Sequence, residues 1–393
     1  MGGSNRRGLR SGVLAFLKGI ASHPAGVAIA GRFMKFFKAI AVCSLSAGLA
    51  LSFGSSAAAE PSLPTAEDTG LYGSQDPTFD GVFRQGLAIS GLVAADRKVS
   101  KSSVSWLLNQ QCSDGSFQAY RTDTEDECSV PDPETFTGPD TNSTALAAMA
   151  LRATGEAQAS KSAVAWLRNA QNATDGGFPF IKGGDSDANS TGLALAAIRG
   201  AQSSNKNKDS LKRGKKYLKG LMLRCSSPKA QRGLLSFQSD PKVLNELASA
   251  QGALGLLTSL PSSSTSVSTK GGAIKCSNGK TTEKPKLTAA LLAGLKKQLK
   301  KNNWLLPSSF GSGPDISASS YAVLAMTSAE RYGKKVKKVL KKIKNNAADF
   351  TETDGAPNAG ALGTLLLVSA ATDSNPRSFG GVDLVSALKG SVQ

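Results

Sequence analysis

Blocks of small and apolar residues recur along the chain, and each begins with a side chain that favours a helix N-terminus. The block Asp140-Thr-Asn-Ser-Thr-Ala-Leu-Ala-Ala returns as Asp187-Ala-Asn-Ser-Thr-Gly-Leu-Ala-Leu and, more loosely, as Asp315-Ile-Ser-Ala-Ser-Ser-Tyr-Ala-Val. Asp, Asn and Ser commonly cap helices. Three further segments, around residues 85, 251 and 360, repeat the small–Leu–small pattern. The pattern predicts six buried helices, which begin near residues 80, 141, 188, 245, 315 and 357.

A second kind of helix alternates with the first and is amphipathic. In the segment 334–345, Val336, Val339, Leu340 and Ile343 fall on one helical face and seven lysines cover the rest. Comparable segments are 104–111, 164–171, 211–224, 287–300 and 382–389. Repeats of roughly 40–70 residues that each hold a helix pair indicate a solenoid or a closed ring. Because buried helices alternate with solvent-facing ones, we favour the ring, an all-α fold without a β-sheet of consequence.

Two of the amphipathic segments end in a shared motif, in which a Trp is followed five residues later by a Gln and then by an Asp-Gly turn and a Phe. Its members are Trp106, Gln111, Gly115 and Phe117 in the first copy and Trp166, Gln171, Gly176 and Phe178 in the second. These residues resemble the aromatic–Gln–Gly–aromatic repeats of the terpenoid cyclase and protein prenyltransferase (squalene cyclase-like) superfamily. The resemblance covers roughly residues 75–390 and implies an α/α toroid of six inner and six outer helices. The toroid also occurs in cobalamin-binding proteins of the transcobalamin type.

The residue types of this motif suggest what it does. Asp-Gly favours a tight turn, and Gly permits a positive φ. A Gln side chain can satisfy backbone groups that are left open at helix ends, and the Phe can fill the gap between successive repeats. We therefore predict that the eight motif residues hold neighbouring repeats together. The alternative is that the aromatic residues line a substrate cavity.

The first 59 residues have the character of a leader. They carry seven basic and no acidic residues, and a largely apolar run from 39 to 53 precedes Ala57-Ala58-Ala59. This order predicts a signal peptide cleaved before Glu60, with an uncleaved anchor as the alternative. Translation from either Met1 or Met34 is compatible with it. We expect a protein that is secreted, extracellular or associated with the cell envelope. In it, residues 60–74 form a flexible lead-in and residues 75–393 form the toroid.

Four cysteines follow the leader. An even number in an exported chain indicates two disulfides, for which three pairings exist. We favour the local one, Cys112–Cys128 and Cys225–Cys276, because each bond would tie a helix end to the loop after it. Cys276 lies in the Ser- and Thr-rich stretch 258–283, which we expect to be a flexible loop.

Residues of common catalytic centres are scarce. The single histidine, His23, lies in the leader, which removes Ser-His-Asp catalysis and His-ligated metal sites from the mature chain. The nearest match to the Asp-x-Asp-Asp motif of terpene cyclases, at residues 185–188, lacks the last acid, and aromatic residues make up 6% of the chain. We assign no catalytic residue, no metal and no cofactor. A terpene cyclase-like or a carboxylate-based enzyme remains an alternative.

In a ring of helical hairpins the inner helices all begin at one mouth. Their N-terminal ends would offer backbone donors and uncharged polar side chains to a polar or anionic ligand. Plain N-capping is the alternative for each residue. The resemblance to cobalamin-binding toroids implies a small, corrinoid-like ligand that is handed to a membrane importer. The ligand-binding candidates are Gln85, Asn142, Thr144, Asn189, Thr191, Gln251, Ser317, Tyr321 and Asn358.

Charge is distributed unevenly along the chain, whose formal net charge is +18. Residues 60–200 carry 18 acidic and 10 basic side chains, whereas residues 201–393 carry 11 acidic and 30 basic ones. Lysines cluster at 212–219, 296–301 and 334–344, all on predicted outer helices. These runs form either a solvated surface or the contact of a scaffold with anionic lipid or polymer of the cell envelope. Nucleic acid is not expected, because no aromatic residues interleave the basic runs.

Overall fold

The computed structural model describes residues 69–393 except 263–271, 283–285, 310 and 331. All of these belong to one compact unit, Ala66–Gln393. The predicted leader, residues 1–59, lies outside the described residues. Among the described residues, no helix is both long and apolar enough to cross a membrane.

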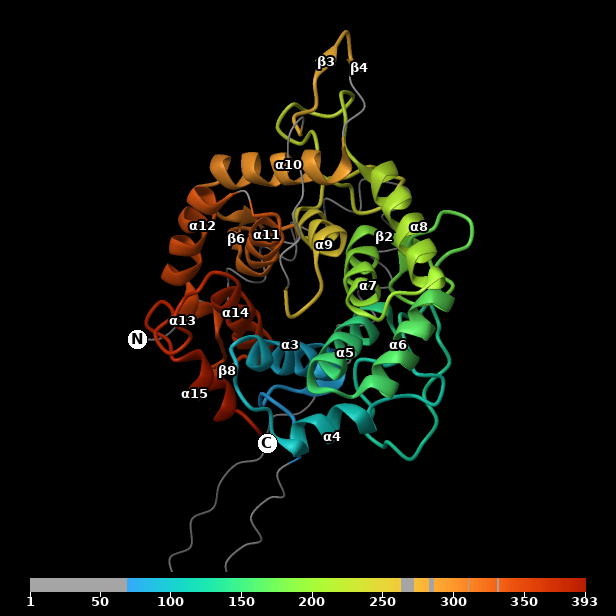
Figure 1. Cartoon of the computed structure of the whole chain (residues 1–393), viewed down its shortest axis with the longest axis vertical. Helices are drawn as coiled ribbons and strands as arrows, with labels where there is room; N and C mark the ends of the chain where they lie inside the picture. Colours follow the sequence, from blue (N-terminus) through green and yellow to red (C-terminus); the bar gives the residue numbers. More distant parts are fainter. Residues whose placement is uncertain (1–68, 263–271, 283–285, 310, 331) are drawn as a thin grey trace, which may run out of the picture. The chain divides into compact units, whose positions relative to one another are not determined.

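Six helices form an inner ring in this unit (Figure 1). Each contacts the next, and the last contacts the first, so the ring is closed. Their buried, Ala- and Leu-rich sequences agree with the predicted inner helices, whose expected starts lie within two residues of the observed ones. The inner helices are α3 (Gly81–Ala94), α5 (Thr141–Thr154), α7 (Ala188–Gly200), α9 (Glu246–Leu257), α11 (Ile316–Ser328) and α14 (Ala359–Ala371).

Six outer helices surround them, and each packs on the inner helix that precedes it in the chain. In the most strongly amphipathic of these helices, Val336, Val339 and Ile343 are buried against the ring while most of the lysines face solvent. The all-α toroid predicted from the sequence is therefore confirmed. The outer helices are α4 (Lys101–Asn109), α6 (Ala157–Ala170), α8 (Asn205–Leu221), α10 (Leu287–Lys301), α12 (Gly333–Asn345) and α15 (Leu384–Lys389).

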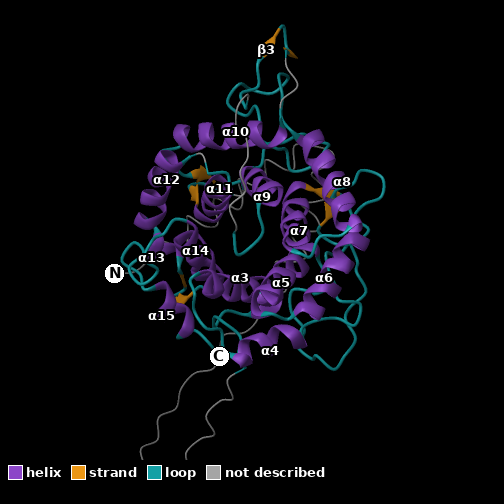
Figure 2. Ribbon diagram, in the orientation of Figure 1, coloured by secondary structure: helices purple, strands orange, loops and turns teal. Residues whose placement is uncertain are grey.

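The remaining elements are short (Figure 2). A 3-10 turn, η2 (Pro77–Phe79), and a four-residue helix, α13 (Ala347–Phe350), lie between the longer helices. Four antiparallel hairpins have strands of two residues each, and three of them directly precede an inner helix. The hairpins are β1 (Phe178–Pro179) with β2 (Ser186–Asp187), β3 (Cys276–Ser277) with β4 (Lys280–Thr281), β5 (Leu306–Pro307) with β6 (Pro314–Asp315), and β7 (Glu352–Thr353) with β8 (Ala356–Pro357).

Glycines let the inner helices approach closely. A Cβ added at Gly363 of α14 would lie 2.5 Å from the carbonyl oxygen of Leu87 on α3. A Cβ at Gly192 of α7 would lie 2.5 Å from the backbone of Gln251 on α9. Real Cβ atoms do not come so near, so small residues at these crossings are a condition of ring closure.

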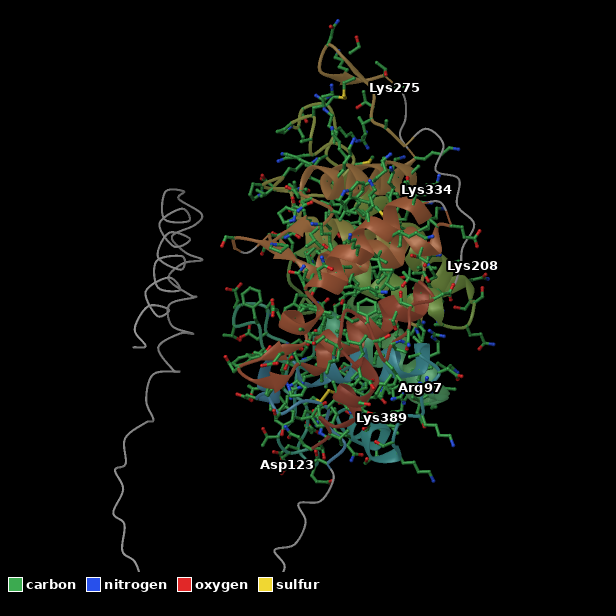
Figure 3. All side chains as sticks on the ribbon, turned by 90° about the vertical axis from the view of Figure 1, so that its left-hand side faces the viewer. Arg97, Asp123, Lys208, Lys275, Lys334 and Lys389 are labelled. Atoms are coloured by element: carbon green, nitrogen blue, oxygen red, sulfur yellow. A yellow bond between two sulfur atoms is a disulfide. The ribbon has the colours of Figure 1, made fainter. Side chains whose placement is uncertain are left out.

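All inner helices begin at the same end of the ring, because each outer helix runs back along its partner. We call this the mouth end, and the opposite end, where the inner helices finish, the far end. In the side view of Figure 3, Asp123, in the segment before α5, lies on one side. Arg97, just after α3, and Lys208, near the start of α8, lie on the other.

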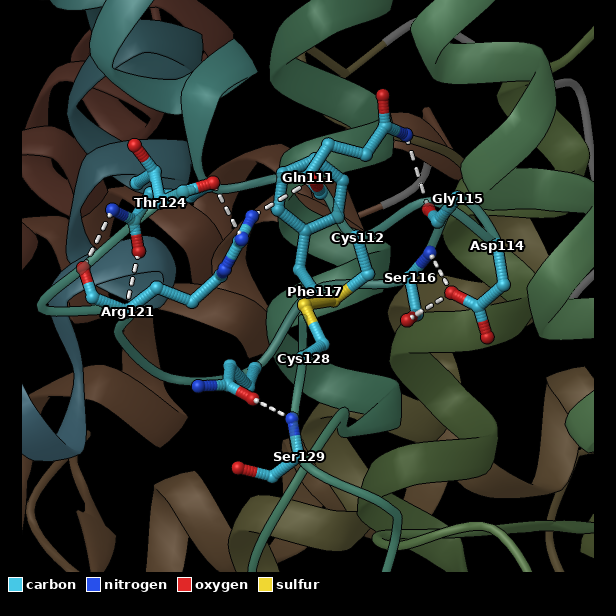
Figure 4. The surroundings of a disulfide bond; sticks show 12 residues. Gln111, Cys112, Asp114, Gly115, Ser116, Phe117, Arg121, Thr124, Cys128 and Ser129 are labelled. Carbon is cyan, nitrogen blue, oxygen red and sulfur yellow. Dashed lines mark hydrogen bonds between the residues drawn. A yellow bond between two sulfur atoms is a disulfide. The ribbon is translucent and has the colours of Figure 1, made fainter. Parts of the chain in front are cut away.

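The first copy of the Gln motif joins two outer helices. Gln111 Nε2 donates to the carbonyl oxygen of Gly115, 3.0 Å away (Figure 4). It also donates to the carbonyl oxygen of Ala159 on α6, again over 3.0 Å. Gly115 has a φ of +89°, and a Cβ there would lie 2.8 Å from Ser162. Only glycine suits this turn, because both the backbone conformation and the neighbouring helix exclude a side chain.

The second copy repeats this arrangement one repeat further along. Gln171 Nε2 donates to the carbonyl oxygens of Gly176 (2.8 Å) and of Ser210 on α8 (3.0 Å). Its Oε1 accepts from Ser210 Oγ (2.7 Å) and from Arg213 (2.6 Å). The buried glutamine thus connects one repeat to the next through both ends of its amide.

The aromatic members of the motif are less uniform. Phe117 and Phe178 are fully buried, and Trp166 is nearly so. Trp106 is only half-buried and stacks on Tyr120, with ring centroids 6.4 Å apart. Three of the four aromatics therefore belong to the core of the ring.

The ring is closed by the two ends of the described chain. The backbone N–H of Gly70 donates to the carbonyl oxygen of Gln393 (3.2 Å), and that of Gly73 donates to Ser391 (2.9 Å). Tyr72, between them, is 2% exposed. Residues 69–74, assigned above to a flexible lead-in, are thus part of the toroid, a correction whose cause is this pairing across more than 300 residues.

Candidate functional site

The mouth end is built on five helix N-caps that share one geometry. The side-chain oxygen of each cap accepts the N–H of the residue three positions later, at distances of 2.7–2.9 Å. This bond satisfies one of the donors that every helix start leaves open. The caps are Asp140, Asp187, Asn245, Asp315 and Asn358.

Four residues after a cap, a hydroxyl faces away from the ring axis. Thr144 Oγ1 accepts the N–H of Phe117 (3.0 Å), and Thr191 Oγ1 accepts that of Phe178 (2.9 Å). Both threonines are completely buried. Ligand access to these two side chains is thus blocked, because each is held against the loop that precedes its own helix.

Gln85 plays the same part in the first repeat. Its Oε1 accepts the N–H of Tyr72 (2.9 Å), and its Nε2 donates to the carbonyl oxygens of Gly70 (2.8 Å) and Ser103 (3.0 Å). The side chain is fully buried. Gln85 therefore fastens the N-terminal segment to α4 and does not reach the mouth.

Three of the candidates do meet, on consecutive inner helices. Asn189 Nδ2, on α7, donates to Gln251 Oε1, on α9, over 3.0 Å. Gln251 also hydrogen-bonds the hydroxyl of Tyr321, on α11. Burial raises the pKa of Tyr321 to about 12, so this hydroxyl stays protonated at neutral pH.

Asn142 occupies on α5 the position that Asn189 has on α7, two residues after the cap. The Oδ1 atoms of both asparagines are buried, and neither has a hydrogen-bond partner among the described residues. Buried acceptors of this kind are uncommon in folded proteins because losing hydration without a partner costs free energy. We call Asn142, Asn189, Gln251 and Tyr321 the amide cluster.

The other two candidates lie apart from this cluster. Asn358 is the N-cap of α14, and its Nδ2 donates to Thr353 Oγ1 (3.0 Å) in the preceding hairpin. Ser317, two residues after the cap of α11, is half-buried. The structure thus gathers three of the nine candidates into one hydrogen-bonded group.

Below the amide cluster the barrel is apolar and packed. Positions two, six and nine after a cap share a helical face because a turn takes 3.6 residues. Asn189 and Gln251 occupy positions two and six, and position nine holds Met149, Leu254 and Leu324, each at most 1% exposed. The ring axis is thus polar near the mouth and filled with side chains further in.

The chain itself covers the far end of the barrel. After α9, residues 258–260 run inside the ring (Figure 1), and Leu260 is fully buried. The Leu260 N–H donates to Met149 Sδ (3.3 Å), and Arg152 Nη2 donates to the Leu260 carbonyl oxygen (2.8 Å). The predicted flexible loop 258–283 therefore begins as a buried segment, which we call the strap. This is a correction: the Ser- and Thr-rich composition hid an apolar anchor.

Buried carboxyl groups lie at the starts of the inner helices that carry the amide cluster. Burial raises the pKa of Asp140 and of Asp187 to about 6, although the N–H groups they cap oppose the shift. Glu246, the first residue of α9, also has a raised pKa because it is partly buried, and it contacts Ser309. Glu246 is not among the candidates predicted from the sequence. Its signal in the sequence is an acid directly after a capping Asn, at the start of an apolar helix.

Both predicted disulfides are present. Cys112–Cys128 closes a loop at the mouth end (Figure 4), where Arg121 donates to the carbonyl oxygens of Asn109 (3.2 Å) and Thr124 (2.7 Å). The acidic loop before α5 is thus held by a covalent bond and by one arginine.

The second disulfide, Cys225–Cys276, joins the segment after α8 to the β3–β4 hairpin. It spans 51 residues, against 16 for the first. Paired cysteines of this kind are typical of proteins in oxidising compartments. No group of three or more His, Cys, Asp or Glu side chains that could hold a metal occurs in the described part of the chain.

The predicted lysine runs lie on consecutive outer helices, α8, α10 and α12 (Figure 1). Most of these lysines are exposed. Desolvation lowers the pKa of Lys297, and the nearby charges of Lys229, Arg232 and Lys301 lower it further. Lys335 and Lys338 lie over the ring of Trp304, 5.8 and 4.9 Å from its centroid.

Comparison with known proteins finds no matching family model and no matching curated protein. Solved structures of similar architecture include an α-amylase from Clostridium perfringens, with 10% identity, a TM-score of 0.48 and coverage of 75% of this chain and 87% of that one. A type II terpene cyclase from Scytonema gives 12% identity, a TM-score of 0.44 and coverage of 78% and 80%. A GH76 α-mannanase from Bacteroides thetaiotaomicron gives 11% identity, a TM-score of 0.47 and coverage of 74% of this chain and 85% of that one. At this distance none of them assigns an activity to this chain.

Proposed function

We propose that this protein is a secreted, non-catalytic toroid that binds a small, uncharged polar ligand at its mouth end. The observation that carries the proposal is the amide cluster with its two buried, unpartnered Oδ1 atoms. A ligand that donates N–H or O–H groups would complete both acceptors. A corrinoid, whose periphery carries primary amides, is one such ligand.

The electrostatics of the mouth favour an uncharged ligand. Burial there already raises the pKa values of Asp140, Asp187 and Tyr321, so this environment penalises charge. The polar groups that converge from four inner helices are amides and one phenol. Such groups select by hydrogen-bond geometry, and an analogue that leaves them unpaired is rejected.

The test begins with native mass spectrometry of the exported protein purified from its own host, which identifies a retained molecule. Cobinamide, as a defined probe, is then titrated into the wild type and into the double variant Asn142→Ala, Asn189→Ala. We expect the variant to bind at least tenfold more weakly, which corresponds to about 1.4 kcal/mol.

The matched control is Asn205→Ala, an exposed asparagine on outer helix α8. It should bind as the wild type does. The proposal fails if no small molecule is retained and neither cobinamide nor a panel of neutral amides and sugars binds at millimolar concentration. It also fails if the control and the double variant lose binding equally.

The exposed lysines of α8, α10 and α12 support a second candidate function, attachment to an anionic cell envelope. Three neighbouring outer helices with the same excess of lysine raise the local positive potential on this side of the ring. Co-sedimentation with phosphatidylglycerol vesicles tests this function. Binding should weaken as salt rises toward 0.5 M, where screening lengths fall to roughly 4–5 Å.

A further inference from the structure

A groove of about 630 Å³ lies at the far end of the ring, away from the mouth. It begins where α5 and α7 end and where α6 and α8 begin, and it follows α6 as far as Arg168 in the last turn of that helix. Val164 of α6 and Ala201, just after α7, give it an apolar floor. The groove is therefore separate from the amide cluster, and nothing in the proposed function uses it.

Four cationic side chains line this groove, and none of its lining residues is acidic. They are Arg152, Lys161, Arg168 and Lys206. The acids nearest in the sequence do not line the groove. Glu156 precedes α6 and is not a lining residue, and Asp209 forms an ion pair with Arg213 (3.3 Å). The positive charge of the groove is thus not neutralised by its own walls.

The two arginines are held in position by uncharged partners. Arg168 Nη1 donates to Asn207 Oδ1 (2.8 Å), and Asn207 Nδ2 in turn donates to the Gln202 carbonyl oxygen (2.8 Å). Arg152 Nη2 donates to the strap at Leu260, while its Nε is buried and has no partner among the described residues. Burial lowers the pKa of Arg152, so its surroundings oppose its charge.

The backbone adds to this field. α6 and α8 both begin at the groove, and helix N-termini carry partial positive charge. Glu156, at the N-cap of α6, makes no side-chain capping bond. Two arginines, two lysines and two helix starts therefore line one groove. This combination is typical of anion recognition.

We propose that the groove binds an organic anion, a phosphate or carboxylate carried on a small apolar body. The anionic group lies among Arg152, Arg168 and the two lysines, and the body lies against Val164 and Ala201. The guanidinium groups are preorganised by neutral hydrogen bonds, so the anion gains charge-assisted bonds without displacing an internal carboxylate.

Isothermal titration calorimetry at low salt tests this with four probes: hexyl phosphate, hexanoate, inorganic phosphate and hexanol. Hexyl phosphate and hexanoate should bind, inorganic phosphate should bind more weakly because it leaves the floor empty, and hexanol should not bind. The double variant Lys161→Gln, Lys206→Gln should weaken hexyl phosphate at least tenfold. Both lysines are exposed, so the fold should tolerate the change.

A charge-matched control is Lys212→Gln, Lys216→Gln, two exposed lysines on α8 that do not line the groove. It should change the affinity less than twofold. Equal weakening by both double variants would mean that only the overall charge attracts the anion, and it would overturn the proposal. Binding of hexanol as tight as that of hexyl phosphate, or no binding of any probe at millimolar concentration, would overturn it as well.

Discussion

The two ends of this ring are made from the same repeats yet differ in chemistry. At the mouth end, a long segment with a disulfide-closed loop precedes α5, and short hairpins precede α7, α11 and α14. At the far end, the connection between α5 and α6 is only residues 155–156, and that between α7 and α8 is 201–204. Long loops bury polar groups at the mouth, whereas these two short connections leave the adjoining helix termini and cations open.

In the two binding proposals made above, this difference assigns two kinds of ligand to the two ends of one repeat protein. The mouth relies on neutral hydrogen-bonding groups, because burial there opposes charge on Asp140 and Asp187. The far end keeps Lys161 and Lys206 in contact with solvent, so charge costs little. Arg152 is the exception, since it lines the groove and also holds the strap that covers the barrel.

The two disulfides allow the largest test of this contrast. Cys112–Cys128 lies within the mouth-end loop, whereas Cys225–Cys276 closes a longer segment that includes α9 and the strap. Loop entropy predicts the loss in free energy of unfolding when the two cysteines of one bond are replaced by serine. The loss should be about 3 kcal/mol for the first bond and about 4 kcal/mol for the second. Urea unfolding of each double variant, compared with the oxidised wild type, measures both losses. A larger loss for the mouth-end bond would contradict this ordering.

The next largest effect should be in the dependence of stability on pH, which a buried acid at the mouth end should change and an exposed acid near the far end should not. Asp187 has a folded pKa of about 6, above the value of about 3.9 expected in the unfolded chain. The folded state therefore holds its proton between these values, and stability falls as pH rises from about 4 to about 6. Asp187→Asn keeps the cap at Oδ1 but loses the acceptor of the Ser190 Oγ bond. It should remove this fall and make the variant more stable at pH 7 by about 2 kcal/mol, which is about 3 kcal/mol from the pKa difference less about 1 kcal/mol for the lost bond.

The control for this titration is Asp209→Asn, an exposed acid near the far end. Its profile of unfolding free energy against pH should follow that of the wild type. If Asp187→Asn is no more stable than the wild type at pH 7, then the carboxylate at this cap is better solvated than its burial indicates.

The smallest expected effect concerns the link between groove and strap. Arg152→Gln removes the charged hydrogen bond to Leu260 and should lower the free energy of unfolding by about 1.5–3 kcal/mol. Arg168→Gln loses one charge-assisted bond to a side-chain amide, whereas Arg152 bonds both Ser259 and Leu260, so Arg168→Gln should lower it by less, about 1.5 kcal/mol. Denaturant melts of the two variants give the difference. Similar losses would mean that Arg152 does not stabilise the strap.

The toroid could be predicted because its signals are local. Capping residues and small–Leu–small blocks mark each inner helix, and the observed starts at Thr141 and Ala188 match the predicted positions. The Gln motif contains both partners of one of its hydrogen bonds, Gln111 with Gly115. Outer helices were predicted less well, since α8 begins at Asn205, six residues before the apolar pattern becomes visible.

The site could be predicted only in part, because it depends on helix phase and on distant contacts. Thr144 and Asn142 both belong to one capping segment, but two residues turn a side chain by about 200°, so one faces the loop and the other faces the axis. Nothing local shows that Gln251 meets Asn189 across 62 residues. The groove could not be predicted because its residues come from four helices that are separate in the sequence. An arginine such as Arg152, at the end of an alanine-rich helix, is the one local signal for it.

The pairing of residues 70–73 with residues 391–393 sets the order of events during synthesis. A segment made near the start has no partner until residue 393 has left the ribosome. At about 5–20 residues per second, this delay is on the order of tens of seconds. Until then α3 lacks its neighbour α14, and the first repeats have an open edge. A nascent chain in this state cannot close its ring, so the first repeats keep one unpaired face until the last repeat has been made.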